Sequence, residues 1–146
     1  MKRSSISALA IAATLTATAA NAELLANSDL SLDPVEQATQ VDAMIAVVFE
    51  PLEPKIPGIV DKMVDIADCE SNRNQLRPDG SLKENSDPDS SAAGVFQILL
   101  ITHRPDYERK NLNPVEVADN IRFARYMVER KHRRGRENVY EDWECA

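Results

Sequence analysis

Two cysteines, Cys69 and Cys145, are the only ones in the 146-residue chain, and they lie far apart in it. An even number of cysteines in an exported protein is typical of a disulfide framework. A bond between these two would stabilise the fold by about 4 kcal/mol if it forms without strain. We therefore expect a disulfide that holds the C-terminal end against the middle of the chain, rather than two free thiols.

The N-terminus has the three parts of a secretory signal peptide. Lys2 and Arg3 form a positive start, residues 6–20 are apolar and rich in alanine, and an Ala-Asn-Ala cleavage site ends at Ala22. The apolar run is short for a membrane-spanning helix, which needs about 20 apolar residues. We expect cleavage after Ala22, a secreted or periplasmic mature protein, and no stable membrane anchor once the signal peptide is removed.

The charge of the chain argues against a nucleic-acid partner. The net charge is −7, and it becomes more negative when Lys2 and Arg3 leave with the signal peptide. Such a chain should not bind nucleic acid strongly through non-specific phosphate contacts. The basic run 130–136 fits a solvated helix end, where cations are favoured by the helix dipole. A weaker interpretation is a surface that docks an acidic partner.

No metal site or cofactor is expected. His103 and His132 do not lie at zinc-ligand spacing from either cysteine. Asp87 and Asp89 are close together, but no ordered loop of further calcium ligands follows them.

Three segments have apolar residues at helical spacing and predict helices. The first begins after Asp33, an N-cap before a first-turn proline, and ends before the proline-rich connector 50–57. The second spans about 58–69. The third spans 114–132, where Asn113 and the proline after it form another cap. The apolar positions of the three stripes are Val41, Met44, Ile45 and Val48; Val60, Met63, Val64 and Ala67; and Val117, Ile121, Ala124 and Val128.

The remaining segments are polar or short. Residues 71–93 read as a long polar loop with a small hairpin at 78–81, and long loops inside compact domains are often functional. Residues 92–100 predict a short helix. No alternating run is long enough for an extensive sheet, so the fold class is all-α, or α+β at most. The mature chain divides into an N-terminal helical extension and linker, 23–56, and a main domain, 57–146.

Glu70 extends the apolar stripe of the second predicted helix. It follows Ala67 by three residues and therefore lies on the same helix face, at the helix end. A carboxyl group partly removed from water has a raised pKa and keeps a proton for donation near neutral pH. Glu70 is the candidate catalytic acid. Position alone also fits an ordinary solvated glutamate, so the surrounding residues must decide.

The residues that follow Glu70 form a recognisable series. Glu70-Ser71 is followed, after the polar loop, by Ser-Ala-Ala-Gly-Val-Phe-Gln-Ile at 91–98, and then by Asn120 on the long helix. This order resembles the lysozyme-like superfamily, closest to goose-type lysozymes and the lytic transglycosylases with an SLT-like domain. The resemblance covers about residues 57–146. It departs at Asn72, where glycine is usual, although asparagine tolerates a left-handed backbone.

The resemblance implies a small helical lysozyme-like domain and a role for each matching residue. Glu70 would be the general acid and then the base. Ser71 would orient the substrate or Glu70 through its hydroxyl. Gln97 would hydrogen-bond an N-acetyl or hydroxyl group of the sugar, and Gly94 would let the backbone approach the glycan. Asn120 would support the floor of the cleft. Structural alternatives exist for two of them: Gly94 as a turn residue, and Asn120 as a satisfied buried amide.

The implied activity is cleavage of peptidoglycan glycan strands at the MurNAc-GlcNAc β-1,4 bond by a monomeric exported enzyme. Hydrolysis with two carboxylates needs a partner acid. Asp79, Asp87 and Asp89 are available in the polar loop, although solvated turn residues describe them better. Lytic transglycosylases of this kind use one acid, with help from the N-acetyl group of the substrate, and leave an anhydro-sugar end. The alternative is a non-catalytic cell-wall glycan-binding module on the same scaffold.

Overall fold

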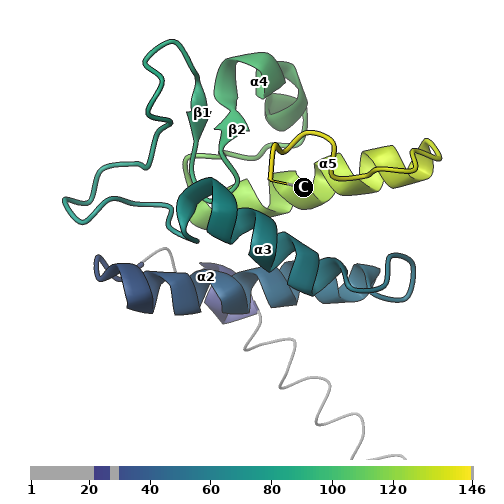
Figure 1. Ribbon diagram of the computed structural model, residues 1–146, viewed down its shortest axis with the longest axis horizontal. Coiled ribbons are helices and arrows are strands. Elements are labelled where there is room, and N and C mark those ends of the chain that lie inside the picture. The colour runs from purple at the N-terminus through teal and green to yellow at the C-terminus, as the bar shows by residue number, and fades with distance from the viewer. Residues whose placement is uncertain (1–21, 27–29, 146) are drawn as a thin grey trace, which may run out of the picture.

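The computed structural model describes residues 22–26 and 30–145, so nearly all of the expected signal peptide lies outside the described residues. The described chain is mostly helical, which confirms the predicted fold class (Figure 1). Its elements after the short helical segment 22–26 are α2 (Pro34–Phe49), η1 (Glu50–Leu52), α3 (Ile59–Ser71), β1 (Ala92–Ala93), β2 (Ile98–Leu99), α4 (Leu100–Arg109) and α5 (Val117–Arg133).

Helix α2 begins where the sequence predicts. Asp33 is its N-cap, and the Asp33 carboxylate accepts hydrogen bonds from the backbone N–H groups of Val35 and Glu36, both at 3.0 Å. The helix packs against both α3 and α5. Its buried face shares one hydrophobic core with the rest of the chain. The segment 23–56, set apart as an extension by its sequence, therefore contributes α2 to the same core as residues 57–146.

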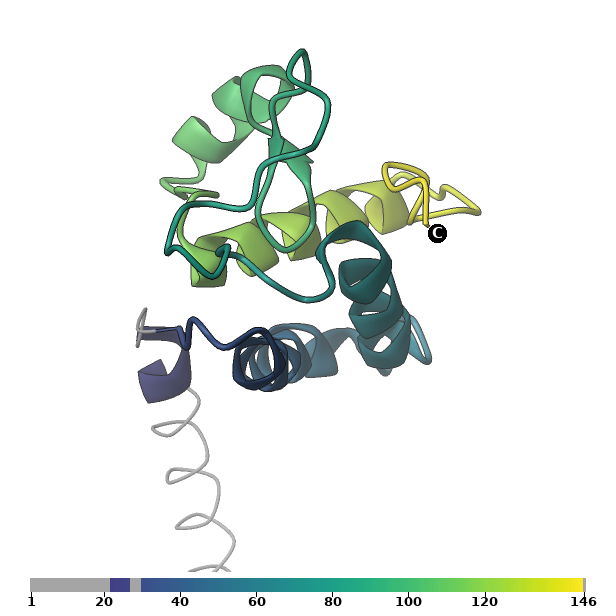
Figure 2. The ribbon, with the colours of Figure 1, turned by 60° about the vertical axis from the view of Figure 1, so that its left-hand side comes forward.

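Helix α3 crosses α2 and ends below the two short strands (Figures 1 and 2). Ile59, Met63 and Ile66 are fully buried on its inner face. Asn72, its C-cap, has a φ of 54° in the left-handed region, and its N–H donates to the carbonyl groups of Ala67 and Asp68. Asparagine is one of the residues that adopt this conformation most readily. The helix therefore ends at a left-handed C-cap without the glycine that is usual in the family that the sequence resembles.

Residues 92–100 do not form the predicted helix. They form an antiparallel hairpin in which Ala92 pairs with Leu99 and Ala93 pairs with Ile98. The physical reason lies outside the segment, because two side-chain amides bind the N–H groups of the turn. Gln75 Oε1 accepts from Val95 N at 2.9 Å, and Asn120 Oδ1 accepts from Phe96 N at 3.1 Å.

The second half of the chain differs from expectation in two further details. Helix α5 begins at Val117 rather than at Pro114, because residues 114–116 form a turn and Glu116 is the N-cap. Helix α4 was not predicted. It has an internal proline, Pro105, and none of its residues is fully buried. Its sequence therefore gives only a weak helical signal.

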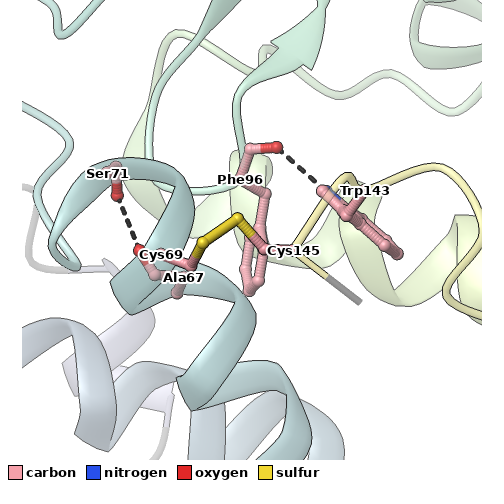
Figure 3. The surroundings of a disulfide bond; sticks show 6 residues. All are labelled: Ala67, Cys69, Ser71, Phe96, Trp143 and Cys145. Atoms are coloured by element: carbon pink, nitrogen blue, oxygen red, sulfur yellow. Dashed lines mark hydrogen bonds between the residues drawn. A yellow bond between two sulfur atoms is a disulfide. The ribbon is translucent and has the colours of Figure 1, made fainter.

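The predicted disulfide between Cys69 and Cys145 is present, with the two Cα atoms 6.0 Å apart. It joins the last turn of α3 to the C-terminal end of the described chain (Figure 3). Disulfides of this kind are more typical of extracellular or periplasmic proteins than of cytosolic ones. Within residues 22–26 and 30–145, no helix is both long and apolar enough to cross a membrane.

Candidate active site

Glu70 lies in the last turn of α3, on the helix face that turns inward. Ala67, one turn before it, is fully buried, whereas Glu70 itself is half-buried. Its Oε1 atom is buried and has no hydrogen-bond partner among the described residues. The helix stripe thus continues into a carboxyl group that is partly removed from water, as the sequence predicts.

The surroundings of Glu70 favour its protonated form. Burial raises the pKa of the Glu70 carboxyl above its usual range because desolvation disfavours the charged form. The backbone N–H of Cys145 partly opposes this rise, and the negative charge of Glu144 adds to it. The net direction is upward. A carboxyl group in this state can donate a proton at a higher pH than an ordinary glutamate.

Glu70 borders a cleft of about 270 Å³. We call this the Glu70 cleft. Its lining residues are Cys69, Glu70, Ser71, Asn72, Lys83, Glu84, Asn85, Ser86 and Gln97. The cleft therefore lies between the end of α3, the polar loop and the hairpin turn. The structure brings together here three of the residues predicted to have catalytic or binding roles, namely Glu70, Ser71 and Gln97.

The Ser71 hydroxyl makes its hydrogen bonds at the end of α3 and not in the Glu70 cleft. Ser71 is 2% exposed. Its Oγ donates to the carbonyl oxygen of Ala67 at 3.1 Å and accepts from Asn74 N at 3.2 Å. Both hydrogen-bonding directions are thus used inside the protein. This geometry corrects the expectation that the hydroxyl orients the substrate or Glu70, since it fixes the turn that follows the helix instead.

Gln97 lies at the end of the hairpin turn, with a φ of 44° in the left-handed region. Its side-chain Nε2 donates to the carbonyl oxygens of Gly94 at 2.9 Å and Lys83 at 3.2 Å. These bonds fix the amide at the cleft edge. They leave Oε1 of Gln97 without a donor in the described part of the chain, so this atom is available to accept from a ligand.

Gly94 and Asn120 do not line the Glu70 cleft. The space beside the Gly94 Cα atom is filled by the side chains of Asn120 and Gln75, so the expectation that Gly94 lets the backbone approach a glycan is wrong. Asn120 is fully buried, and its Nδ2 donates to the carbonyl oxygens of Ala93 and Pro114. It is a satisfied buried amide that holds the hairpin from below.

The three aspartates suggested as partner acids do not line this cleft. Asp79 accepts from the backbone and hydroxyl of Ser81 in the turn after Arg77, which forms as predicted. Asp87 and Asp89 lie on the exposed loop and do not line the cleft. The second carboxylate in the lining is Glu84, which sequence reasoning missed.

Lys83 and Glu84 were missed because only pairing brings them to the cleft. A bridge between Glu84 and Ala93, with Gly94 N donating to Lys83 O at 2.8 Å, places this part of the loop beside β1. The ammonium group of Lys83 then donates to the carbonyl oxygen of Ser71 at the end of α3. Burial, with a smaller effect of the Arg77 charge, lowers the pKa of Lys83. A charged residue in a polar loop looks like an ordinary surface residue, so the local sequence does not indicate that it lines a cleft.

Two further pockets adjoin the Glu70 cleft. One, of about 510 Å³, lies between the polar loop and α4, and it shares Glu84 and Asn85 with the cleft. The other, of about 300 Å³, lies between the start of α2 and the end of α3, and it shares Asn72. The Glu70 cleft is thus the middle one of three neighbouring depressions.

Comparison of the chain with protein-family models, with curated proteins and with solved structures gives no match. Within residues 22–26 and 30–145, no group of three or more His, Cys, Asp or Glu side chains could hold a metal ion. The chemistry of the site therefore has to be inferred from its own residues.

Proposed function

We propose that this protein is an exported glycosidase that cleaves peptidoglycan, and that it acts as a lytic transglycosylase with Glu70 as general acid and then base. One observation above all supports the proposal. The carboxyl group of Glu70 is partly desolvated, has a raised pKa and opens onto a cleft lined by hydrogen-bonding side chains. Desolvation of this kind is how glycosidases keep a carboxylic acid protonated for the leaving group.

The proposed reaction begins with proton transfer from Glu70 to the glycosidic oxygen as the bond to the MurNAc anomeric carbon breaks. The carbonyl oxygen of the substrate's N-acetyl group stabilises that carbon by bonding to it. Glu70, now ionised, then removes the proton from the sugar's own 6-hydroxyl, whose oxygen attacks the same carbon and displaces the N-acetyl oxygen from it. The product is an anhydro-sugar end, and Glu70 regains its proton. The resemblance of Glu70-Ser71 and the 91–98 segment to lytic transglycosylases supports this route.

The residues of the cleft fit an amide-bearing, hydroxyl-rich ligand. Gln97 offers Oε1 to an N–H or O–H donor of the sugar, while Lys83 and Ser71 hold the end of α3 in place. Asn120 acts at a distance, because it fixes the hairpin that presents Gln97. The pockets on either side of the Glu70 cleft provide room for a substrate that extends beyond one bond, which a glycan strand does.

The proposed location is the periplasm or the cell exterior. The disulfide and the expected signal peptide at residues 1–22 both support it. Peptidoglycan is in the same compartment. The proposed enzyme acts as a monomer.

The test is digestion of purified peptidoglycan by the mature protein and by Glu70→Gln. Glutamine keeps the shape of the protonated acid but donates no proton to a leaving oxygen, so we expect a loss of roughly 10²- to 10⁴-fold or more. Asp65→Asn, on the exposed face of the same helix, is the matched control and should cut as well as wild type. Equal activity of Glu70→Gln and wild type would refute the assignment of the acid.

The products separate the proposed reaction from its alternatives. Mass spectrometry of the released muropeptides should show anhydro ends, which are lighter by one water than the reducing ends of hydrolysis. Reducing ends would identify a lysozyme-type hydrolase. Retention of the protein on peptidoglycan without any new fragment would instead identify a non-catalytic glycan-binding module.

A further inference from the structure

The C-terminal segment, residues 134–145, has no helix or strand and is anchored by two buried side chains, Val139 and Trp143. Trp143 is only 6% exposed, and its Nε1 donates to the carbonyl oxygen of Phe96 at 3.0 Å. The rings of these two residues lie 5.9 Å apart between centroids. Phe96 belongs to the hairpin turn that also presents Gln97. The C-terminal segment is therefore held directly against the hairpin turn (Figure 3).

Ion pairs fix the same segment to α5. The side chain of Lys131 is 9% exposed, and its ammonium group lies 2.7 Å from a carboxylate oxygen of Asp142 and 3.4 Å from one of Glu141. A cation so nearly buried requires a partner, because an unpaired buried charge is costly. Two independent contacts thus determine the path of the chain up to Trp143.

The last two described residues, Glu144 and Cys145, reach Glu70 itself. Cys69 immediately precedes Glu70, so the Cys69–Cys145 bond ties the chain end to the residue beside the acid. The backbone N–H groups of Cys145 and Glu144 approach the Glu70 carboxyl, and the Glu144 carboxylate lies near enough to repel it. One oxygen of this carboxyl group, Oε1, is buried from solvent.

We infer that Cys145 is a positioning residue of this site: its disulfide to Cys69 holds the backbone of residues 144–145 over one side of the Glu70 carboxyl and shields that side from water. The inference rests on the proposed function, in which Glu70 is the acid. The bond then has a second role besides stability, because it sets the environment in which the acid holds its proton. The other titratable groups near the carboxyl are Lys83 and Glu84, which line the same cleft from the polar loop, and Glu144, which repels it from the C-terminal segment.

The experiment is an NMR titration of the Glu70 carboxyl in wild type and in the double variant Cys69→Ser/Cys145→Ser. Freeing the chain end removes part of the burial, the Glu144 charge and the two N–H groups. The first two raise the pKa and the last lower it, and the net direction in the intact protein is upward. In the proposed arrangement the shielding by residues 144–145 and the Glu144 charge together outweigh the two N–H groups, so we expect the pKa of Glu70 to fall toward its usual range in the double variant. The alkaline limb of the pH profile for peptidoglycan cleavage should move down with it.

A second pair of variants keeps the disulfide and does not depend on folding without it. Glu144→Lys reverses the charge beside Glu70 and should lower the pKa of the Glu70 carboxyl. Glu137→Lys makes the same charge change on an exposed part of the same segment and should leave that pKa nearly unchanged. Equal effects of the two variants, or an unchanged Glu70 pKa in the double serine variant, would overturn the inference.

The titration measures the pKa of Glu70 without any substrate. It therefore tests the positioning role of Cys145 separately from the proposed function. A protein that leaves peptidoglycan uncut but shows the expected fall in the pKa of Glu70 would refute the proposed function and leave the positioning role of Cys145 standing. A protein that cuts peptidoglycan through Glu70 with no change in that pKa would do the reverse.

Discussion

The side-chain amide of Asn120 in α5 fills the space where a Cβ atom on residue 94 would lie, so the hairpin turn fits onto α5 only with Gly94. The Asn120 Cγ atom would be 3.0 Å from that Cβ, and Oε1 of Gln75 would be 2.6 Å from it. Gly94 also has a φ of 78°, which residues with side chains rarely adopt. The same two amides bind the N–H groups of Val95 and Phe96. One close contact therefore determines where the turn that presents Gln97 lies.

Gly94→Ala should destabilise the protein by about 2–4 kcal/mol, because a methyl group would meet buried amides that have no free space to move into. The measurement is urea denaturation followed by far-UV circular dichroism. Gly58→Ala is the matched control, since Gly58 has a φ of 77° but no atom within 4 Å of the added Cβ. It should cost only the backbone strain, about 1–2 kcal/mol. If both variants lose the same stability, the contact with Asn120 adds nothing to the cost of a side chain at position 94.

Asn120→Ala should cost about 2–3 kcal/mol, since it leaves the N–H of Phe96 without its acceptor and removes one donor from each of the carbonyl groups of Ala93 and Pro114. The same denaturation experiment measures it. Asn138→Ala is the control, because exposed Asn138 also accepts one backbone N–H, from Tyr140. There water replaces the lost partner, and the expected cost stays below about 1 kcal/mol. A small effect at Asn120 would mean that the hairpin does not depend on this amide.

Local patterns in the sequence were sufficient where a helix buries its own apolar stripe. The stripe through Met63 and Ala67 predicted α3, and its continuation predicted the half-buried position of Glu70. Asp33 predicted the start of α2 through its capping side chain. The presence of only two cysteines predicted the disulfide between them. In each case the signal and the structure depend on residues close in sequence, or on a pairing with only one possible partner.

The sequence could not indicate the buried amides that join distant segments. Gln37 in α2 accepts from the backbone of Gln75 and Leu76 at 2.7 and 2.8 Å, and Gln75 in turn binds Val95. Glutamines at such positions look like ordinary polar surface residues. The apolar run at 92–100 is compatible with a helix by itself, and only these long-range hydrogen bonds select the hairpin. The same limit explains why Lys83 and Glu84 were missed as cleft residues.

Trp143→Phe should destabilise the protein by about 1–3 kcal/mol, because the buried carbonyl group of Phe96 loses its only donor in the described structure and the smaller ring leaves a gap. Thermal or urea unfolding followed by circular dichroism measures the change. Tyr140→Phe is the control in the same segment, since the Tyr140 hydroxyl makes no hydrogen bond within the described residues, and it should stay within about 0.5 kcal/mol of wild type. Equal losses of stability in the two variants would show that the Trp143 hydrogen bond and the larger ring contribute nothing measurable to stability.

Glu70→Gln should be more stable than wild type at neutral pH. The folded protein raises the pKa of Glu70, so it favours the protonated form. That contribution to stability is fully present below the pKa of the unfolded chain and is lost as the pH rises through the higher folded pKa. Glutamine stays neutral throughout. We therefore expect the two proteins to be equally stable near pH 3.5, and the variant to melt at a higher temperature than wild type at pH 7. Melting curves at several pH values measure this difference, with Asp65→Asn as the control for the loss of one negative charge. A wild type that matches Glu70→Gln at pH 7 would mean that the ionised carboxylate is well solvated, which the proposed acid cannot be.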